Sequence, residues 1–147
     1  MIEVSMGQRI LVTIDGSEQS EKALRYAVDQ YPDAEFILMH VIHGHPGHYF
    51  QMGKSGYSST EEYEDEYEET EELLSSLEER IVPAGTTVST TIESGEPTRT
   101  IVSYTAENDI DLIVLGSHGR SGASRVLLGS VAESVTRRSS VPVLIVR

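Results

Sequence analysis

The sequence contains no cysteine, which excludes disulfides, thiolate nucleophiles, iron–sulfur clusters and thiolate zinc sites. Long apolar runs are also missing: the longest have about seven residues, whereas roughly twenty are needed to span a bilayer. The first nine residues lack the apolar core of a secretory signal. We therefore expect a cytoplasmic protein without a membrane span. A length of 147 residues is typical of one domain, here residues 1–147.

Basic residues are scarce, with two lysines and nine arginines against 24 acidic residues and a formal net charge of −13. Eleven of those acids lie in residues 61–79, which contain no base, so the acidity is local. A chain of this sign is repelled by a phosphate backbone, and we expect no nucleic-acid partner. Few lysines and many acids together resemble proteins of salt-loving (halophilic) organisms. The alternative is that the excess of acidic residues is a property of residues 61–79 alone and does not reflect adaptation to salt.

Short apolar runs alternate with stretches of helical periodicity. The run from Phe36 to Ile42 lacks regular alternation, which is typical of a strand buried on both faces of a parallel sheet. This order predicts an α/β fold in which a five-stranded parallel sheet is covered by helices on both faces. The predicted strands are 9–14, 36–42, 86–92, 111–116 and 141–146, and the predicted helices are 18–31, 61–81, 97–105 and 130–138.

Two of these strands have the character of edge strands. The strand at 86–92 is less apolar than the others, and Pro142 has no N–H to donate to a neighbouring strand. Residues 43–60 are rich in Gly, His and Ser and have no period, so we interpret them as a loop. The acidic segment that follows carries an apolar stripe at helical spacing, which we interpret as core packing. Its members are Tyr63, Tyr67, Thr70, Leu74, Leu77 and Ile81.

Sheets of this kind bind ligands at the carboxyl ends of their strands, beside the point where strand order reverses. Asp15, Val41 and Gly116 each stand at or near such an end. After Gly116, nine residues separate Gly119 from Gly129, and Ser130 opens the last helix. Glycine backbone, a helix start and a nearby arginine are the parts of a phosphate site. The alternative is that these glycines only turn the strand into the helix.

The pattern Gly-x2-Gly-x9-Gly-Ser resembles the ATP-binding signature of the universal stress protein family. Other stretches also resemble this family: ILVTIDGSEQSEKALRYA near the start, the strand LMHVI, the Gly95-Glu96-Pro97 turn and the final VPVLIVR. The resemblance covers nearly the whole chain except about residues 43–80. That segment, a variable loop and the acidic helix, matches no fixed pattern.

The resemblance implies an adenine nucleotide alpha-hydrolase-like fold of strand order 3-2-1-4-5. It implies a homodimer paired through Val141–Val146, and ATP as ligand, carried with Mg²⁺. By position, Asp15 would accept a ribose hydroxyl, the Val41 backbone would meet adenine and Gly116 would line the ribose. Gly119, Gly129 and Ser130 would donate to the phosphates. The expected contacts are completed by Thr13, which stands where the family often has proline, and by His118, Arg120 and Val131.

Three other motifs are weaker candidates for a functional site. Gly53-Lys54-Ser55 resembles the end of a Walker loop, but the required earlier glycine is His48. His43, His45 and His48 are possible metal ligands, although loop histidines are more often solvated. Ser117-His118 lacks the glycine spacing of a nucleophile elbow. Asp15 has a structural alternative, in which it caps the Gly16-Ser17 turn.

We therefore expect an ATP-binding regulatory or stress-response protein and assign no catalytic or metal-ligating residue. Two alternatives stay open. One is a slow ATPase or autokinase using His118, Arg120 and nearby serines, for which no positioned base is evident. The other is a nucleotide-independent module that binds an unknown protein partner through residues 43–80.

Overall fold

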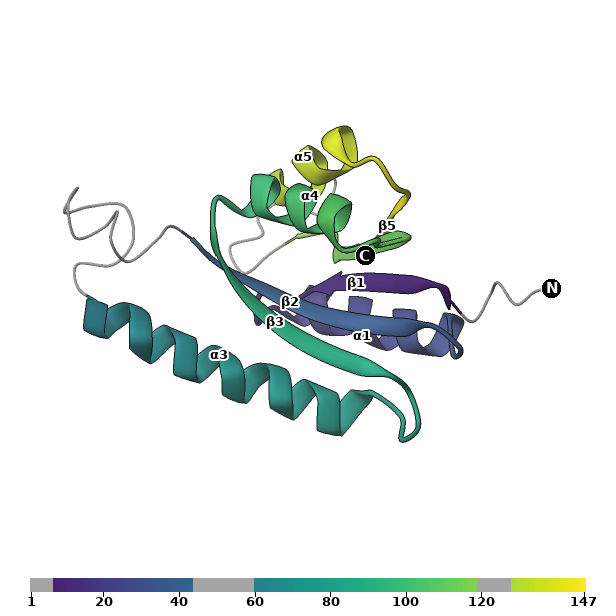
Figure 1. The fold of residues 1–147 in the computed structure, drawn as a ribbon, viewed down its shortest axis with the longest axis horizontal. Helices are drawn as coiled ribbons and strands as arrows, with labels where there is room; N and C mark the ends of the chain where they lie inside the picture. Colours follow the sequence, from purple (N-terminus) through teal and green to yellow (C-terminus); the bar gives the residue numbers. More distant parts are fainter. Residues whose placement is uncertain (1–6, 44–59, 119–127) are drawn as a thin grey trace.

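The computed structural model describes residues 7–43, 60–118 and 128–147. Five parallel strands form one sheet of order β3-β2-β1-β4-β5, which confirms the predicted fold and strand order. Helices connect the strands (Figure 1). The elements are β1 (Arg9–Thr13), α1 (Glu18–Gln30), β2 (Glu35–His43), α3 (Thr60–Ile81), β3 (Val88–Gly95), α4 (Pro97–Glu107), β4 (Leu112–Gly116), α5 (Ser130–Arg138) and β5 (Val143–Val146).

The helices form two layers, one on each face of the sheet. Figure 1 shows α1 and α3 on one side and α4 and α5 on the other. Alternate strand residues supply the two cores: Ile10 and Val12 of β1 pack toward α1 and α3, whereas Leu11 packs toward α4 and α5. All three are fully buried. Burial of β1 on both faces explains why its sequence is continuously apolar.

Both predicted edge strands are at the edges, β3 on one side and β5 on the other. Their bounds differ from those predicted. β3 begins two residues later because Thr86 closes a turn with the Pro83 carbonyl (3.2 Å), and it continues to Gly95. β5 is shorter than predicted, although the Pro142 carbonyl still accepts the N–H of Ile113 (3.1 Å).

The apolar stripe of α3 is core packing over only part of its length. Thr70, Leu74 and Leu77 are buried, as predicted. Tyr67 is 38% exposed, so its assignment to the core was wrong. The reason is that Tyr67 lies at the open groove between α3 and β3 and outside the buried core cluster to which Leu74 and Leu77 belong. In the part of the chain that the structure describes, no helix is both long enough and apolar enough to cross a membrane.

Two helices begin as the sequence predicts. The Ser17 hydroxyl caps α1 by accepting the N–H of Ser20 (3.1 Å). Pro97 is the first residue of α4, and the carboxylate of Glu96 accepts the N–H groups of Arg99 (2.9 Å) and Thr98 (3.2 Å). The Arg99 N–H holds the pKa of Glu96 below its usual value; burial opposes this, and the Thr98 N–H adds to it.

We expect Glu96→Ala to lower the free energy of unfolding at neutral pH by about 1 kcal/mol, the usual cost of losing a helix cap. The folded-state pKa of Glu96 lies below its unfolded value. The stabilisation is therefore complete above the unfolded pKa and is lost as the pH falls through the folded pKa. Urea unfolding of both proteins from about pH 7 to about pH 2 measures this difference.

Glu107→Ala is the matched control, because Glu107 is exposed at the other end of α4. We expect no loss of stability from it. A loss in Glu96→Ala that did not change with pH would contradict a role for the ionised carboxylate.

Candidate functional site

The strand register brings the predicted site residues that the structure describes to the carboxyl ends of neighbouring strands. Val12 of β1 lies opposite Val114 of β4, so Asp15 and Gly116 follow neighbouring strand ends. β2 lies on the other side of β1, with Thr13 opposite Met39, and Val41 comes two residues later. β1 and β4 are the strands at which the order reverses, where parallel sheets form a binding crevice.

The N-terminus of α5 is joined to the end of β4. The Ser117 N–H donates to the Val146 carbonyl (2.9 Å), and the Ser117 carbonyl accepts the N–H of Gly129 (2.7 Å). These two bonds place Gly129, Ser130 and Val131 beside the strand end. Gly119 and Arg120 lie outside the described residues, so their predicted roles stay predictions.

Asp15 caps the Gly16-Ser17 turn, which is the structural role that the alternative interpretation predicts. It is half-buried, and its Oδ1 accepts both the N–H of Ser17 (2.9 Å) and the Ser17 hydroxyl (2.5 Å). A carboxylate offers about four acceptor positions on two oxygens. Since both bonds end on Oδ1, capping the turn is compatible with a further hydrogen bond to Oδ2.

Gly116 is needed for close packing. A Cβ at this position would lie 2.8 Å from the carbonyl carbon of Gln19 and 2.9 Å from its carbonyl oxygen. Any side chain here would push β4 away from the first turn of α1. The sequence did not indicate this contact, because Gly116 and Gln19 are far apart in the chain.

His118 carries an unusual buried atom. Its Nδ1 lies 3.3 Å from the hydroxyl oxygen of Ser117. Its Nε2 is buried and has no hydrogen-bond partner among the described residues. Buried polar atoms are nearly always paired, with protein, water or ligand. This nitrogen is therefore a candidate partner for a ligand or for a part of the chain outside the described residues.

The start of α5 has no side-chain cap. Gly129 is its N-cap residue and has no side chain to accept the first N–H groups of the helix. Ser130 is exposed at the first helical position. The first N–H groups have no acceptor within the helix, and together with the positive end of the helix dipole they favour an anion.

His40 was missed by the sequence analysis. It is buried, its Nδ1 lies 2.7 Å from the Ile14 carbonyl oxygen, and its Nε2 lies 3.5 Å from Oε2 of Glu66. It therefore connects the end of β1 and the acidic helix α3. The available signal was a lone histidine within an apolar strand.

The two motifs predicted in residues 43–55, the histidine cluster and Gly53-Lys54-Ser55, receive no support from the described residues. His43 ends β2 instead of starting a loop. His45, His48 and Gly53-Lys54-Ser55 lie outside the described residues. Within 7–43, 60–118 and 128–147, no three His, Asp or Glu side chains gather as a metal site would require.

Comparison with known proteins identifies the family. The model of the universal stress protein family matches residues 6–147. The chain belongs to this family. YxiE, a universal stress protein of Bacillus subtilis, is 35% identical over 150 residues, which cover 97% of this chain and all of YxiE.

Two solved structures of the family are similar to this one. UspA from Lactobacillus plantarum superposes with a TM-score of 0.78 at 25% identity, over 95% of this chain and 97% of UspA. A universal stress protein in complex with cAMP superposes with a TM-score of 0.68 at 26% identity, over 95% of this chain and 97% of that protein. The likeness therefore extends over the whole sheet.

We expect Gly116→Ala to lower the free energy of unfolding by about 1–3 kcal/mol, the usual cost of overpacking a well-packed site. The backbone of Gln19 cannot rotate away from a new methyl group as a flexible side chain would, so β4 and α1 must separate. Urea unfolding measures the loss. Gly7→Ala is the control, because a Cβ there meets nothing within 4 Å. Equal stability of Gly116→Ala and wild type would disprove the packing role.

Proposed function

We propose that this universal stress protein binds ATP, carried with Mg²⁺, and acts as a nucleotide-dependent regulatory protein. The observation that carries the proposal is the grouping of three features at the ends of β1 and β4. These are the Asp15 carboxylate, the buried Nε2 of His118 without a described partner and the uncapped N-terminus of α5. The family structure in complex with cAMP supports an adenine nucleotide as the ligand class.

Each feature suits one part of a nucleotide. The Asp15 carboxylate accepts a ribose hydroxyl while Oδ1 continues to hold the Ser17 turn. The N–H groups at the start of α5, with the Ser130 hydroxyl, donate to phosphate oxygens. His118 Nε2 donates to a phosphate when that nitrogen carries the proton.

Other predicted contacts complete the proposed site. The Val41 backbone meets adenine, and Thr13, Gly116 and Val131 line the crevice. Gly119 and Arg120 add phosphate contacts from the loop after β4. Mg²⁺ bound to nucleotide phosphates takes few protein ligands, and the proposal assigns it none.

A bound nucleotide changes the stability of the protein through the elements that it joins. It adds a link between the turn after β1 and the start of α5, beside the direct contact of Gly116 with Gln19. At about one hundred times its dissociation constant, such a ligand adds about 2.7 kcal/mol to the free energy of unfolding.

The test is nucleotide binding by the intact protein and by Asp15→Asn. We expect ATP to be released from the denatured wild-type protein, identified by chromatography and mass spectrometry, and Mg-ATP to raise the melting temperature. The asparagine side chain keeps an oxygen for the Ser17 turn but loses the charge. A hydrogen bond to a charged group contributes about 1.5–3 kcal/mol, so we expect titration calorimetry to show at least about a tenfold weaker affinity.

Asp29→Asn is the matched control, because Asp29 is exposed on α1 away from the strand ends. It removes the same charge and should leave ATP affinity unchanged. Wild-type protein that releases no nucleotide and shows no thermal shift with Mg-ATP would refute the proposal. Asp15→Asn that binds like wild type would refute the ribose assignment alone.

We further propose that the protein is a homodimer paired through β5, within Val141–Val146. All four residues of β5 are apolar and only partly buried. The carbonyls of Pro142 and Val146 face β4, so the backbone of Val143 and Ile145 faces outward. No other strand pairs with that side among the described residues.

We expect sedimentation equilibrium to show a dimer, and Ile145→Lys to raise its dissociation constant at least about tenfold, since like charges across a strand pair repel. Ile81→Lys is the control, because Ile81 is equally apolar and partly buried but ends α3. A monomeric wild type at about 50 μM, where a specific dimer is populated, would overturn the proposal.

A further inference from the structure

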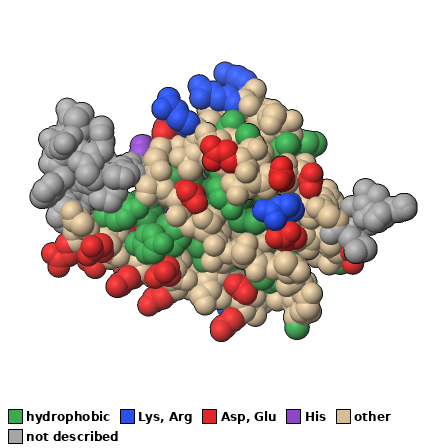
Figure 2. All heavy atoms as spheres, in the orientation of Figure 1, with side chains coloured by type: hydrophobic (Ala, Val, Ile, Leu, Met, Phe, Trp, Pro, Cys, Tyr) green, Lys and Arg blue, Asp and Glu red, His purple; other side chains and the backbone are tan. Residues whose placement is uncertain are grey.

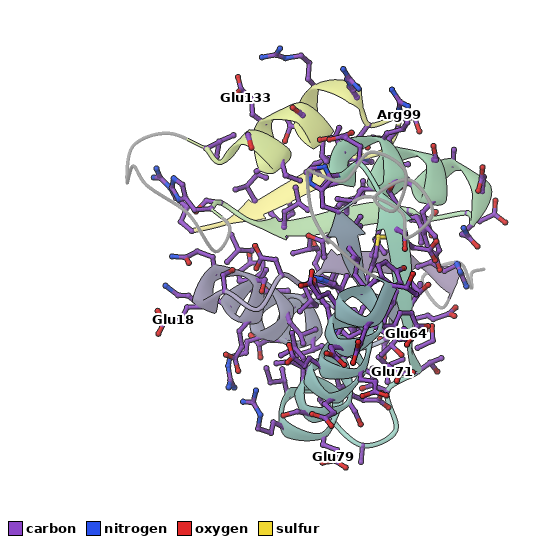
Figure 3. The ribbon with its side chains drawn as sticks, turned by 90° about the vertical axis from the view of Figure 1, so that its left-hand side faces the viewer. Glu18, Glu64, Glu71, Glu79, Arg99 and Glu133 are labelled. Carbon is purple, nitrogen blue, oxygen red and sulfur yellow. The ribbon has the colours of Figure 1, made fainter. Side chains whose placement is uncertain are left out.

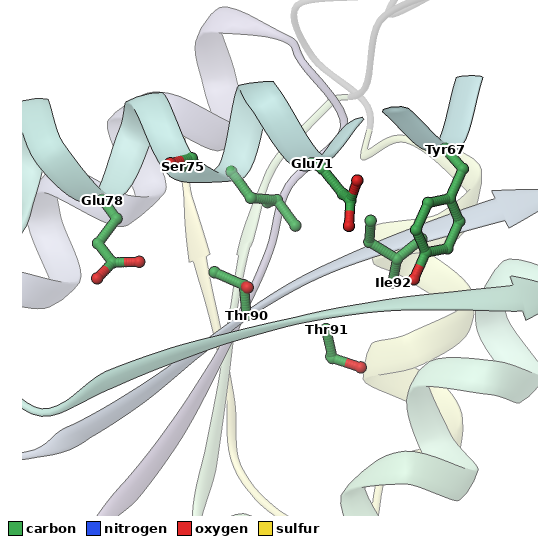
Figure 4. A pocket seen from close by; sticks show the side chains of 8 residues that line it. Tyr67, Glu71, Ser75, Glu78, Thr90, Thr91 and Ile92 are labelled. Carbon is green, nitrogen blue, oxygen red and sulfur yellow. The ribbon is translucent and has the colours of Figure 1, made fainter. Parts of the chain in front are cut away.

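A groove runs between α3 and the edge strand β3, away from the proposed nucleotide site. Its volume is about 400 Å³. Figure 4 shows Tyr67, Glu71 and Glu78 extending from the helix toward Thr90 and Ile92 on the strand. We call it the α3–β3 groove. Its full lining is Tyr67, Glu71, Leu74, Ser75 and Glu78 of α3 with Thr90, Thr91 and Ile92 of β3.

The strand beside the groove presents free backbone groups. The Thr87 carbonyl accepts the N–H of Phe36 (2.9 Å), so Thr87 faces β2. Backbone groups of successive residues point to opposite sides of a strand. Val88, Thr90, Ile92 and Ser94 therefore direct their N–H and C=O groups outward, where no other described strand pairs with them.

This edge has only part of the protection that edges usually carry, the charge of Glu93. β3 has eight residues, and its sequence VSTTIESG contains neither proline nor lysine. Natural proteins usually block a free edge with such residues, a bulge or a covering element. An open edge of this length beside a groove is the geometry used for binding an extended peptide as an added strand.

The charge of the groove selects the partner. Glu71 and Glu78 line it, and α3 contains one base, Arg80. That arginine contacts Glu21 of α1 (2.9 Å) rather than a groove residue. Figure 2 shows acidic side chains gathered on the side of α3, and Figure 3 shows Glu64, Glu71 and Glu79 spaced along it. A second copy pairing here would bring two acidic helices together, which disfavours self-association.

We propose that the α3–β3 groove binds an extended basic segment of another protein, which adds to β3 as a sixth strand. Its backbone pairs with Thr90 and Ile92, and its arginine or lysine side chains reach Glu71 and Glu78. These glutamates are seven residues apart, about 10 Å along the helix. Same-face residues of a strand repeat about every 7 Å, so two basic residues two or four positions apart come within about 4 Å of this spacing, a difference that their long side chains can span. Tyr67 packs on their aliphatic parts.

The test uses a labelled nine-residue peptide that alternates arginine with threonine, measured by fluorescence anisotropy at physiological salt. We expect saturable binding with a dissociation constant below about 1 mM. The Glu71→Gln/Glu78→Gln protein should bind at least about five times more weakly. The matched Glu72→Gln/Glu79→Gln protein loses the same charge from exposed α3 residues outside the groove and should bind like wild type.

The backbone contribution has its own control. Thr90→Pro removes the outward N–H of residue 90 and leaves the hydrogen bonds to β2 intact. Thr90→Val keeps this N–H. We expect the proline variant, but not the valine variant, to bind the peptide more weakly. A peptide N-methylated on its pairing edge should also bind the wild-type protein more weakly, which tests the same backbone bonds without a change in the protein.

Three results would overturn the proposal. These are a dissociation constant above about 1 mM for wild type, equal losses in the two glutamine pairs, which would indicate general charge attraction, or dimerisation through β3 in place of peptide binding. ATP affinity is a separate measurement, so failure here leaves the proposed function standing.

Discussion

β1 pairs with β2 on one side and with β4 on the other, in parallel and in register over its apolar residues. The chain leaves this centre toward β3 and later returns to its other side as β4 and β5. Connections after β1 and β4 therefore run to opposite faces of the sheet, and their first residues are left beside one another. Asp15, Ser117 and the start of α5 have no sequence proximity. Their common position depends on this one strand pairing, which fully buried Val12 and Val114 hold in place.

Close packing around β1 limits which residues can occupy the neighbouring positions. Gly116 lies so near the backbone of Gln19 that α1 and β4 act as one unit at the site. On the other side, His40 joins the Ile14 carbonyl to Glu66 of α3. The residue before Asp15 is thus linked to the acidic helix. The proposed nucleotide site and the α3–β3 groove are built on the same sheet but use different helices and different charges.

Much of the fold was predictable because the three central strands, β2, β1 and β4, are buried on both faces and carry runs of apolar residues. Strand order followed from the family resemblance and was confirmed. The edge positions of β3 and β5 were also predictable, since weak apolarity and Pro142 have local physical meaning. Predictions failed where neighbours decide the outcome. Tyr67 shares the helical stripe of Leu74, yet 38% of it is exposed against 2% of Leu74, because Leu74 packs into the buried core cluster and Tyr67 does not.

The sequence by itself determined the class of fold, the helix starts at Ser17 and Pro97, and the candidate residues of the site, because apolar period, caps and glycine spacing act over a few residues. Only the tertiary structure decided what those residues touch. It showed that Asp15 already holds a turn, that Gly116 serves packing and that His118 Nε2 is buried without a described partner. It also showed that His40 reaches α3 and that β3 leaves an open edge beside two glutamates. The contacts of Gly116 and His40 and the open edge of β3 depend on positions far apart in the chain, and no local pattern encodes them.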